Sequence, residues 1–321
     1  MRLLFMGTPN FACTTLKALI DSGFDMIGVF TQADRPKGRG LEMHPPPIKE
    51  LAQTFHLPVF QPLTLKREAI GDLWSELKPD GVVVVAYGFI LPSWILHSSP
   101  LGCINLHASL LPLYRGAAPI NWAIIRGERE TGVTTMLMDE GMDTGPILLQ
   151  AKMPIMSEDT AASLHDRLSS LGAGLVVKTV EDYTKGMITP QDQPREGSSL
   201  APKLDREIGR LDWNQENHTL FNLIRGINPY PGAYGFLKNR LIKIWYAIPI
   251  EGDARNAEPG MICDFDSGLG LIVQTGKGRI GLKDLQPESK KRMSARSFIT
   301  GYRSNPIGSI FKRFPDQSNG S

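Results

Sequence analysis

The first half of the chain alternates short apolar runs with amphipathic stretches, and this alternation restricts the possible folds more than any other feature. Residues 2–6 and 25–31 have the composition of strands, and residues 11–20 between them carry apolar side chains near helical spacing. Residues 82–86 are apolar without alternation, which is typical of a strand buried on both faces. Consecutive βα units of this kind predict an α/β fold with a Rossmann-like, doubly wound and mostly parallel sheet.

The last third of the chain has a different pattern. Residues 187–202 are polar, contain three prolines and show no periodicity, which is typical of a linker. Beyond them, short alternating runs between Gly-rich turns predict a small, OB-like β-barrel. We therefore expect a first domain over residues 1–188, a linker over residues 189–205 and a barrel domain over residues 206–321. Two domains suit a chain of 321 residues, because single domains cluster near ~100–200 residues.

Charge is divided unequally between these regions. Residues 1–200 carry 17 Lys and Arg against 21 Asp and Glu, a net charge of −4. Residues 201–321 carry 18 against 12, a net charge of +6. A basic C-terminal third indicates a polyanionic partner such as nucleic acid, although chance bias on a solvated surface explains the charge as well.

Several classes of protein do not fit the sequence. The densest apolar stretch, residues 82–92, is far shorter than the ~20 residues of a membrane span, and the N-terminal residues lack the roughly 7–15-residue apolar core of a signal peptide. We therefore expect a cytoplasmic protein without a membrane span, a disulfide framework or a metal site. The cysteines and histidines without ligand spacing are Cys13, Cys103, Cys263, His44, His56, His97, His165 and His218.

Candidate catalytic groups lie near the end of an apolar strand. Asn105 and His107 are two residues apart, so an extended backbone directs both side chains to one side of the sheet. A side-chain amide can hold a developing oxyanion, and an imidazole can move a proton, so the pair suits acyl transfer. Asp143, in a Gly- and Asp-rich turn, could orient the imidazole and stabilise its protonated form.

The same residue types also have structural interpretations. Asn105 can cap the strand–loop junction, His107 can be an ordinary loop histidine, and Asp143 can form an Asx-turn. Residue types alone leave both interpretations open. The turn at residues 7–12 (GTPNFA) resembles a nucleotide-binding turn, but it lacks G-x-G-x-x-G and a following acidic residue, so we expect no dinucleotide site.

Residues 32–47 form a long polar connection with four prolines and two glycines. This segment is too long and too polar for a simple turn, which predicts a mobile functional loop. Arg35, Lys37 and Arg39 give it the composition of a phosphate-contacting arm, whereas a disordered basic insertion is the alternative.

A set of longer motifs makes a family resemblance specific. The chain resembles the methionyl-tRNA formyltransferases, within the folate-dependent formyltransferase superfamily that also includes glycinamide ribonucleotide transformylase. The resemblance extends from residue 1 into the last third of the chain. The segments that carry it are FMGTPNFA (5–12), FTQADRPKGRG (30–40), VVAYGFILP (84–92), INLHASLLPLYRGAAPI (104–120), MDEGMDTGPIL (138–148), APKLDREIGRLDW (201–213) and INPYPGAY (227–234).

The resemblance implies a reaction and a catalytic group. The formyl group of 10-formyltetrahydrofolate would pass to the α-amino group of methionine on initiator tRNA, giving formylmethionyl-tRNA for translation initiation. The family's catalytic residues correspond to Asn105, which would hold the oxygen of the tetrahedral intermediate, His107, which would shuttle a proton, and Asp143, which would position His107. Asp139 is not the matching acid, and no metal is required.

The resemblance also implies binding residues. The family's folate site corresponds to Ser109, Leu110, Leu111 and Pro112, together with a loop that contains Tyr87, Gly88, Ile90 and Leu91. Initiator tRNA would meet the arm through Arg35, Lys37 and Arg39 and the linker through Lys203, with Arg39 the best single candidate. Catalysis would belong to residues 1–188 and tRNA binding to residues 206–321, in a protein that we expect to be a monomer.

Two departures and two competing hypotheses stand beside this interpretation. Asn10 replaces a frequent Asp and Leu113 a frequent basic residue, which affects at most a peripheral tRNA contact. A formyltransferase acting on a sugar nucleotide or small amine would use the same catalytic group, but the basic barrel and the long arm argue against it. A folate- or RNA-binding protein without catalysis would lack one of the three catalytic residues, and all three are present.

Overall fold

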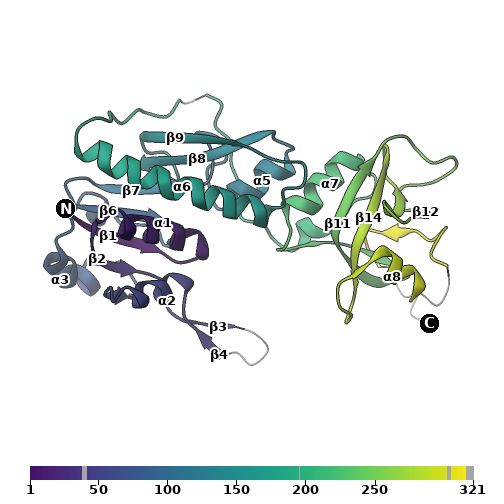
Figure 1. Ribbon diagram of the computed structural model, residues 1–321, viewed down its shortest axis with the longest axis horizontal. Helices are drawn as coiled ribbons and strands as arrows, with labels where there is room; N and C mark the ends of the chain where they lie inside the picture. The colour runs from purple at the N-terminus through teal and green to yellow at the C-terminus, as the bar shows by residue number, and fades with distance from the viewer. Residues whose placement is uncertain (38–41, 195, 302–304, 316–321) are drawn as a thin grey trace. The chain divides into compact units, whose positions relative to one another are not determined.

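The computed structural model describes residues 1–37, 42–194, 196–301 and 305–315 (Figure 1). The chain forms two compact units. The first unit contains residues 1–119, 130–154 and 165–201, and the second contains residues 120–129, 155–164 and 202–321. The two units therefore interleave along the chain, because two short internal segments leave the first unit and belong to the second.

A seven-stranded sheet forms the centre of the first unit, in the order β5-β2-β1-β6-β7-β8-β9. The first five strands of this order are parallel, and β8 and β9 are antiparallel to their neighbours. The predicted Rossmann-like sheet is confirmed, with every residue of β6 buried at its centre. The strands are β1 (Arg2–Gly7), β2 (Asp25–Phe30), β5 (Val59–Phe60), β6 (Gly81–Val85), β7 (Cys103–His107), β8 (Glu130–Leu137) and β9 (Ile147–Pro154).

Helices cover both faces of this sheet. On one face, α1 and α6 lie side by side (Figure 1), and Ser169 of α6 donates a hydrogen bond to Thr14 of α1 at 2.8 Å. On the other face, Ile70 and Trp74 of α3 and Ile95 of α4 pack into a core with the strands. The helices of the first unit are α1 (Asn10–Asp21), α2 (Pro47–Thr54), α3 (Arg67–Leu77), α4 (Ser93–Leu96) and most of α6 (Ala161–Thr184), whereas α5 (Pro119–Ile125) belongs to the second unit except for its first residue.

Residues 32–47, predicted as a mobile loop, contain a two-stranded antiparallel hairpin of β3 (Arg35–Lys37) and β4 (Glu42–His44). Figure 1 shows this hairpin projecting from the sheet of the first unit. At its base, Gln61 and Lys49 donate to the carboxylate of Asp34 at 2.7 and 2.9 Å, and these bonds lower the pKa of Asp34. The prolines and glycines of this segment obscure in the sequence the pairing between residues 35–37 and 42–44.

The second unit is built on a curled antiparallel sheet in the order β12-β13-β14-β11-β10-β16, with β15 paired to β14. The two ends of this order meet, because Met261 before β12 bridges to Ile310 before β16. The predicted barrel is thus confirmed as a curled antiparallel sheet. Its elements are β10 (Ala233–Leu237), β11 (Arg240–Ile250), β12 (Ile262–Asp266), β13 (Gly270–Gln274), β14 (Arg279–Pro287), β15 (Met293–Ser294), β16 (Phe311–Lys312), the 3-10 helix Glu207–Gly209, α7 (Asn217–Gly226) and α8 (Ala295–Thr300).

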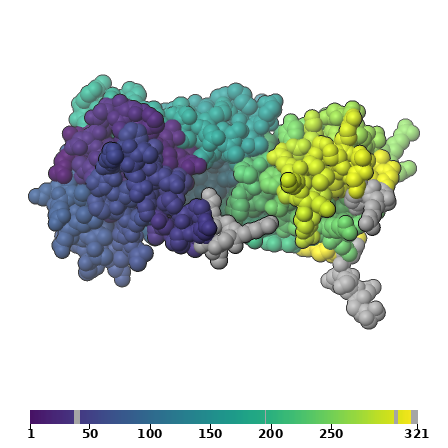
Figure 2. Space-filling view, turned by 60° about the horizontal axis from the view of Figure 1, so that its bottom comes forward, coloured from purple at the N-terminus to yellow at the C-terminus, as the bar shows by residue number. Residues whose placement is uncertain are grey.

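Apolar side chains from these strands and from two helices fill the core of the second unit. Leu220 and Ile224 of α7 and Phe298 of α8 pack with the strand residues. In Figure 2, the C-terminal part of the chain, in yellow, covers part of the near face of this unit. Within the described residues, no helix is long and apolar enough to cross a membrane.

Candidate active site

The last strand of the parallel series, β7, carries two of the predicted catalytic residues. Asn105 pairs with Val84 of β6 in register, and its side-chain nitrogen Nδ2 donates to the Val84 carbonyl at 3.1 Å. His107 is 6% exposed, and its Nε2 lies 2.9 Å from the carbonyl oxygen of Tyr114. A carbonyl only accepts hydrogen bonds, so Nε2 carries the hydrogen and Nδ1 is the basic nitrogen of the neutral ring.

The turn between β8 and β9 brings the predicted acid to this histidine. Asp143 Oδ1 lies 3.6 Å from His107 Nδ1, and Asp143 Oδ2 accepts a hydrogen bond from the Gly116 backbone at 2.8 Å. Asp139 is used differently, because its carboxylate accepts from Thr144 and Gly141 within the same turn. Strand β7 and the turn between β8 and β9 therefore bring the predicted imidazole and carboxylate together, and Asn105 lies two residues before His107 on the same strand.

The loop after β7 contains four predicted folate-binding residues. Side chains of β8 and β9 hold this loop through hydrogen bonds. The buried Ser109 hydroxyl donates to the Leu113 carbonyl at 2.6 Å, so it shapes the loop from inside. Thr134 of β8 accepts from the Leu111 backbone, and Gln150 of β9 donates to the Leu111 carbonyl. Leu111 is itself buried, whereas Leu110 and Pro112 are half-buried.

The loop after β6 contains the other four predicted folate-binding residues. Tyr87 is buried, and its carbonyl accepts from Thr8 at 2.9 Å and from Gln32 at 3.1 Å. Burial also raises the pKa of the Tyr87 hydroxyl. Gly88 has φ +85° and is exposed, as Ile90 is, while Leu91 is buried. Gln32 was not named from the sequence, although it lies within a motif that carries the family resemblance.

A cavity of about 240 Å³ adjoins the catalytic group. Most of its wall consists of apolar side chains, and the turn that carries Asp143 forms the rest. An apolar wall with a few polar groups suits an aromatic ring system of limited size. The lining residues are Phe89, Ile90, Leu91, Met136, Met138, Asp139, Glu140, Gly141, Met142 and Asp143.

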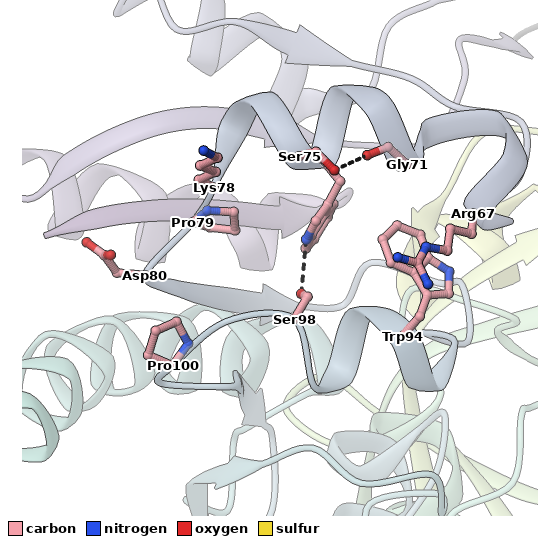
Figure 3. A pocket seen from close by; sticks show the side chains of 10 residues that line it. Arg67, Gly71, Ser75, Lys78, Pro79, Asp80, Trp94, Ser98 and Pro100 are labelled. Carbon is pink, nitrogen blue, oxygen red and sulfur yellow. Dashed lines mark hydrogen bonds between the residues drawn. The ribbon is translucent and has the colours of Figure 1, made fainter.

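A larger cavity of about 640 Å³ lies between α3 and α4 (Figure 3). Three of its polar side chains bond within the protein, since Trp74 Nε1 donates to Ser98 at 3.0 Å and Ser75 donates to the Gly71 carbonyl at 2.8 Å. None of the predicted site residues is among the described residues that line it. We therefore assign the candidate active site to the smaller cavity beside Asp143.

The predicted tRNA-binding residues belong to different parts of the chain. Arg35 and Lys37 form the ends of β3, and the exposed Arg35 side chain donates to the Gln32 amide oxygen. Arg39 lies outside the described residues. Lys203 is exposed and belongs to the second unit. Across the part of the chain that the structure describes, no group of His, Cys, Asp and Glu could hold a metal ion.

The segment predicted as a linker takes part in the site. The Ser199 side chain accepts from the Tyr114 backbone at 2.9 Å, and its carbonyl accepts from the Arg115 backbone at 2.8 Å. Ala201 donates in turn to the Arg115 carbonyl at 2.7 Å. These bonds fix the loop that supplies the Tyr114 carbonyl to His107. Their sequence signal is weak, because main-chain pairing to a distant loop leaves no periodicity.

Comparison with known proteins agrees with this fold. Residues 1–180 match the family described as Formyl transferase, and residues 203–303 match Formyl transferase, C-terminal domain. The chain belongs to the formyl transferase family.

Curated relatives narrow this assignment. The chain is 47% identical over 302 residues to the methionyl-tRNA formyltransferase of Pelotomaculum thermopropionicum, covering 94% of this chain and 96% of that protein. It is also 47% identical over 303 residues to that of Thermodesulfovibrio yellowstonii, with the same two coverages. Within the formyl transferases, the chain therefore groups with the methionyl-tRNA formyltransferases.

Solved structures share the fold at much lower identity. The N-formyltransferase from Helicobacter canadensis, in complex with folinic acid and dTDP-3-aminofucose, is 22% identical with a TM-score of 0.67, covering 87% of this chain and 98% of that one. HypX from Aquifex aeolicus, in complex with tetrahydrofolic acid, is 17% identical with a TM-score of 0.61 over 93% of this chain. The chain spans 47% of HypX. At these identities the likeness concerns the fold alone.

Proposed function

We propose that this enzyme transfers the formyl group of 10-formyltetrahydrofolate to the α-amino group of methionine on initiator methionyl-tRNA. The observation that carries the proposal is the approach of Asp143 to His107 at 3.6 Å, next to an apolar cavity that Asp143 lines, with Asn105 two residues before His107 on the same strand. The relatives at 47% identity support the tRNA acceptor.

The proposed reaction joins the methionine nitrogen to the formyl carbon and breaks the bond between that carbon and the folate nitrogen. One proton passes from the attacking amine to the departing folate nitrogen, so the reaction is balanced without another reactant. A tetrahedral intermediate carries negative charge on the former carbonyl oxygen. A preorganised donor at this oxygen stabilises the transition state.

Asn105 is suited to that donor role. Its amide nitrogen carries two hydrogens, of which one is used by the Val84 carbonyl, so the other is available for the substrate oxygen. The bond to Val84 also fixes the plane of the amide before substrate arrives. We assign the oxyanion contact to this second hydrogen.

His107 is suited to carry the proton. Its Nε2 is committed to the Tyr114 carbonyl, which leaves Nδ1 to accept a proton from the amine and return it to the folate nitrogen. When Nδ1 is protonated, the Asp143 carboxylate at 3.6 Å stabilises the positive charge. Asp143 thereby favours the transient imidazolium, while Tyr114 orients the ring.

The cavity is suited to the pterin end of the folate. Ile90 and Leu91 line it directly, and Tyr87 and Gly88 belong to the same loop. Ser109, Leu110, Leu111 and Pro112 would form the neighbouring part of the folate site. In this arrangement Ser109 and Leu111 support the loop from inside, since both side chains are buried.

For the tRNA, we propose that the basic residues 206–321 bind phosphates and that Arg35, Lys37, Arg39 and Lys203 meet the acceptor end. Residues 1–188 would then perform catalysis, with residues 189–205 connecting the two functions. We further propose that the enzyme acts as a cytoplasmic monomer, which light scattering of the purified protein would test.

The deciding experiment is transfer of a labelled formyl group from 10-formyltetrahydrofolate to methionine-charged initiator tRNA. Elongator methionyl-tRNA and free methionine serve as controls, and an amino-sugar nucleotide provides the arm for the competing acceptor class. We expect label on the initiator tRNA and far less on each control. Preferred labelling of the amino sugar, or no transfer to tRNA, would contradict the proposal.

A further inference from the structure

A glutamine in the predicted linker contacts both loops that hold the catalytic acid. The Gln193 side-chain nitrogen donates to the carbonyl oxygens of Asp143 at 2.9 Å and Gly145 at 2.8 Å. Its side-chain oxygen accepts from Arg115, at 2.6 Å from Nη2 and 3.2 Å from Nε. One amide thus uses both hydrogens and its oxygen to join the acid's turn to the loop after β7.

Asp143 needs such support because its backbone has φ +55°. A non-glycine residue in this left-handed region is disfavoured, and the surrounding contacts must hold it there. Gln193 binds the main chain on both sides of Thr144, while the Gly116 backbone binds the Asp143 carboxylate. Arg115 directly precedes Gly116. Gln193 therefore holds both sides of the bond between the Gly116 backbone and the Asp143 carboxylate, because it contacts Arg115 on one side and the Asp143 main chain on the other.

The main chain around Gln193 is fixed independently of its side chain. Gln191 and Ile147 exchange two backbone hydrogen bonds of 2.7 and 2.9 Å, and Ser199 is bonded to the Arg115 backbone. We therefore expect Gln191 and Ser199 to keep these bonds when the Gln193 side chain is changed. A substitution at Gln193 should remove the clamp on Asp143 without releasing the segment.

We propose that Gln193 is a positioning residue that sets the Asp143 carboxylate against His107. The inference rests on the proposed role of Asp143 in proton transfer. Gln193 acts through Asp143, at 2.9 Å from its carbonyl oxygen, and Asp143 is the group that faces the histidine. The residue therefore influences the reaction rate through geometry rather than through contact with either substrate.

The test compares Gln193→Met, which keeps the length of the side chain but not its amide, with Gln191→Met as the matched control. Gln191 lies two residues away, is exposed and uses its backbone for pairing. We expect Gln193→Met to lower kcat about tenfold, the scale of losing one or two hydrogen bonds. The KM values for tRNA and folate should change less than about twofold, because uniform binding is untouched. Gln191→Met should match the wild type.

A double-mutant cycle with Asp143 distinguishes a positioning role of Gln193 from a general contribution of Gln193 to protein stability. In an Asp143→Asn background, Gln193→Met should cost less than about twofold, because residues that act through one another are not additive. Gln193→Met should also shift the pH–rate profile in the same direction as Asp143→Asn. Full additivity, an unchanged profile or a normal kcat would overturn the inference.

A second variant covers the case in which Gln193→Met does not fold, as judged by circular dichroism. Arg115→Lys keeps the charge but loses the two-nitrogen contact with Gln193, and we expect about a threefold lower kcat that vanishes in the Asp143→Asn background. A loss that persists there would overturn the inference. An inactive wild type, or normal activity of Asp143→Asn alone, would instead contradict the proposed function.

Discussion

The first unit buries the candidate catalytic histidine, whereas the second unit exposes a cluster of basic side chains. His107 is 6% exposed and bonded to the main chain, while Lys290 and Lys291 are exposed beside β14 and β15. Chemistry at one carbon atom requires fixed positions and exclusion of water, but contact with phosphates requires charge that solvent and ions can reach. The two units therefore should respond to different perturbations, and variants in each can test this separation.

The largest expected effect comes from the two candidate catalytic residues on β7. Asn105→Ala or His107→Ala should lower kcat by about 10²–10³, because each removes a group proposed to act in the transition state. KM for the folate and tRNA affinity should change little. Single-turnover formylation and equilibrium binding of both variants would measure the two quantities separately. Near-normal turnover at saturating substrates would contradict the catalytic assignment.

A smaller effect is expected from the exposed cations of the second unit. Reversing Lys290 and Lys291 to Glu should weaken tRNA binding about tenfold at low salt and reduce its salt dependence, because phosphate contacts release counterions. Folate binding should not change. Lys185→Glu, at an exposed position in the first unit, is the matched control. Titrations of tRNA binding over a salt series would measure the effect. An equal loss of tRNA affinity in Lys185→Glu would contradict the proposed difference between the two units.

The third prediction concerns the loop that holds the cavity. Gly88→Ala should raise KM for folate about fivefold with a smaller change in kcat, because a Cβ at φ +85° strains the backbone and pushes aside the Gln32 amide that bonds to the Tyr87 carbonyl. Gly186→Ala shares the positive φ of +69° but meets open space, so it controls for backbone strain alone. Steady-state kinetics of both variants would measure the difference. Equal KM values for folate in the Gly88→Ala and Gly186→Ala variants would argue against folate binding at this loop.

These contrasts also show what the sequence could provide. The βα alternation predicts the sheet, and the two-residue spacing of Asn105 and His107 places both on one side of β7, because side chains alternate along a strand. The Gly- and Asp-rich turn and the family resemblance both indicated Asp143, but neither indicated the Gly116 and Gln193 contacts that hold it. Those contacts join residues 27 to 50 positions apart, and no local pattern records such pairing. For the same reason the sequence predicts a linker over residues 189–205, although Gln193, Ser199 and Ala201 bond to the loops beside the site.

The smallest expected effect lies at the base of the hairpin, between the buried site and the exposed arm. Lys49→Met should lower the Tm slightly near neutral pH, because the ammonium group no longer supports the ionised Asp34. Gln61 and Lys49 lower the pKa of Asp34 in the folded protein, so their stabilisation is present above the pKa of the unfolded state. It is lost as the pH falls through the folded pKa. Thermal unfolding from pH 7 downward should therefore show the variant and the wild type converging, and a difference that grows toward acid would assign the Lys49 contact another role.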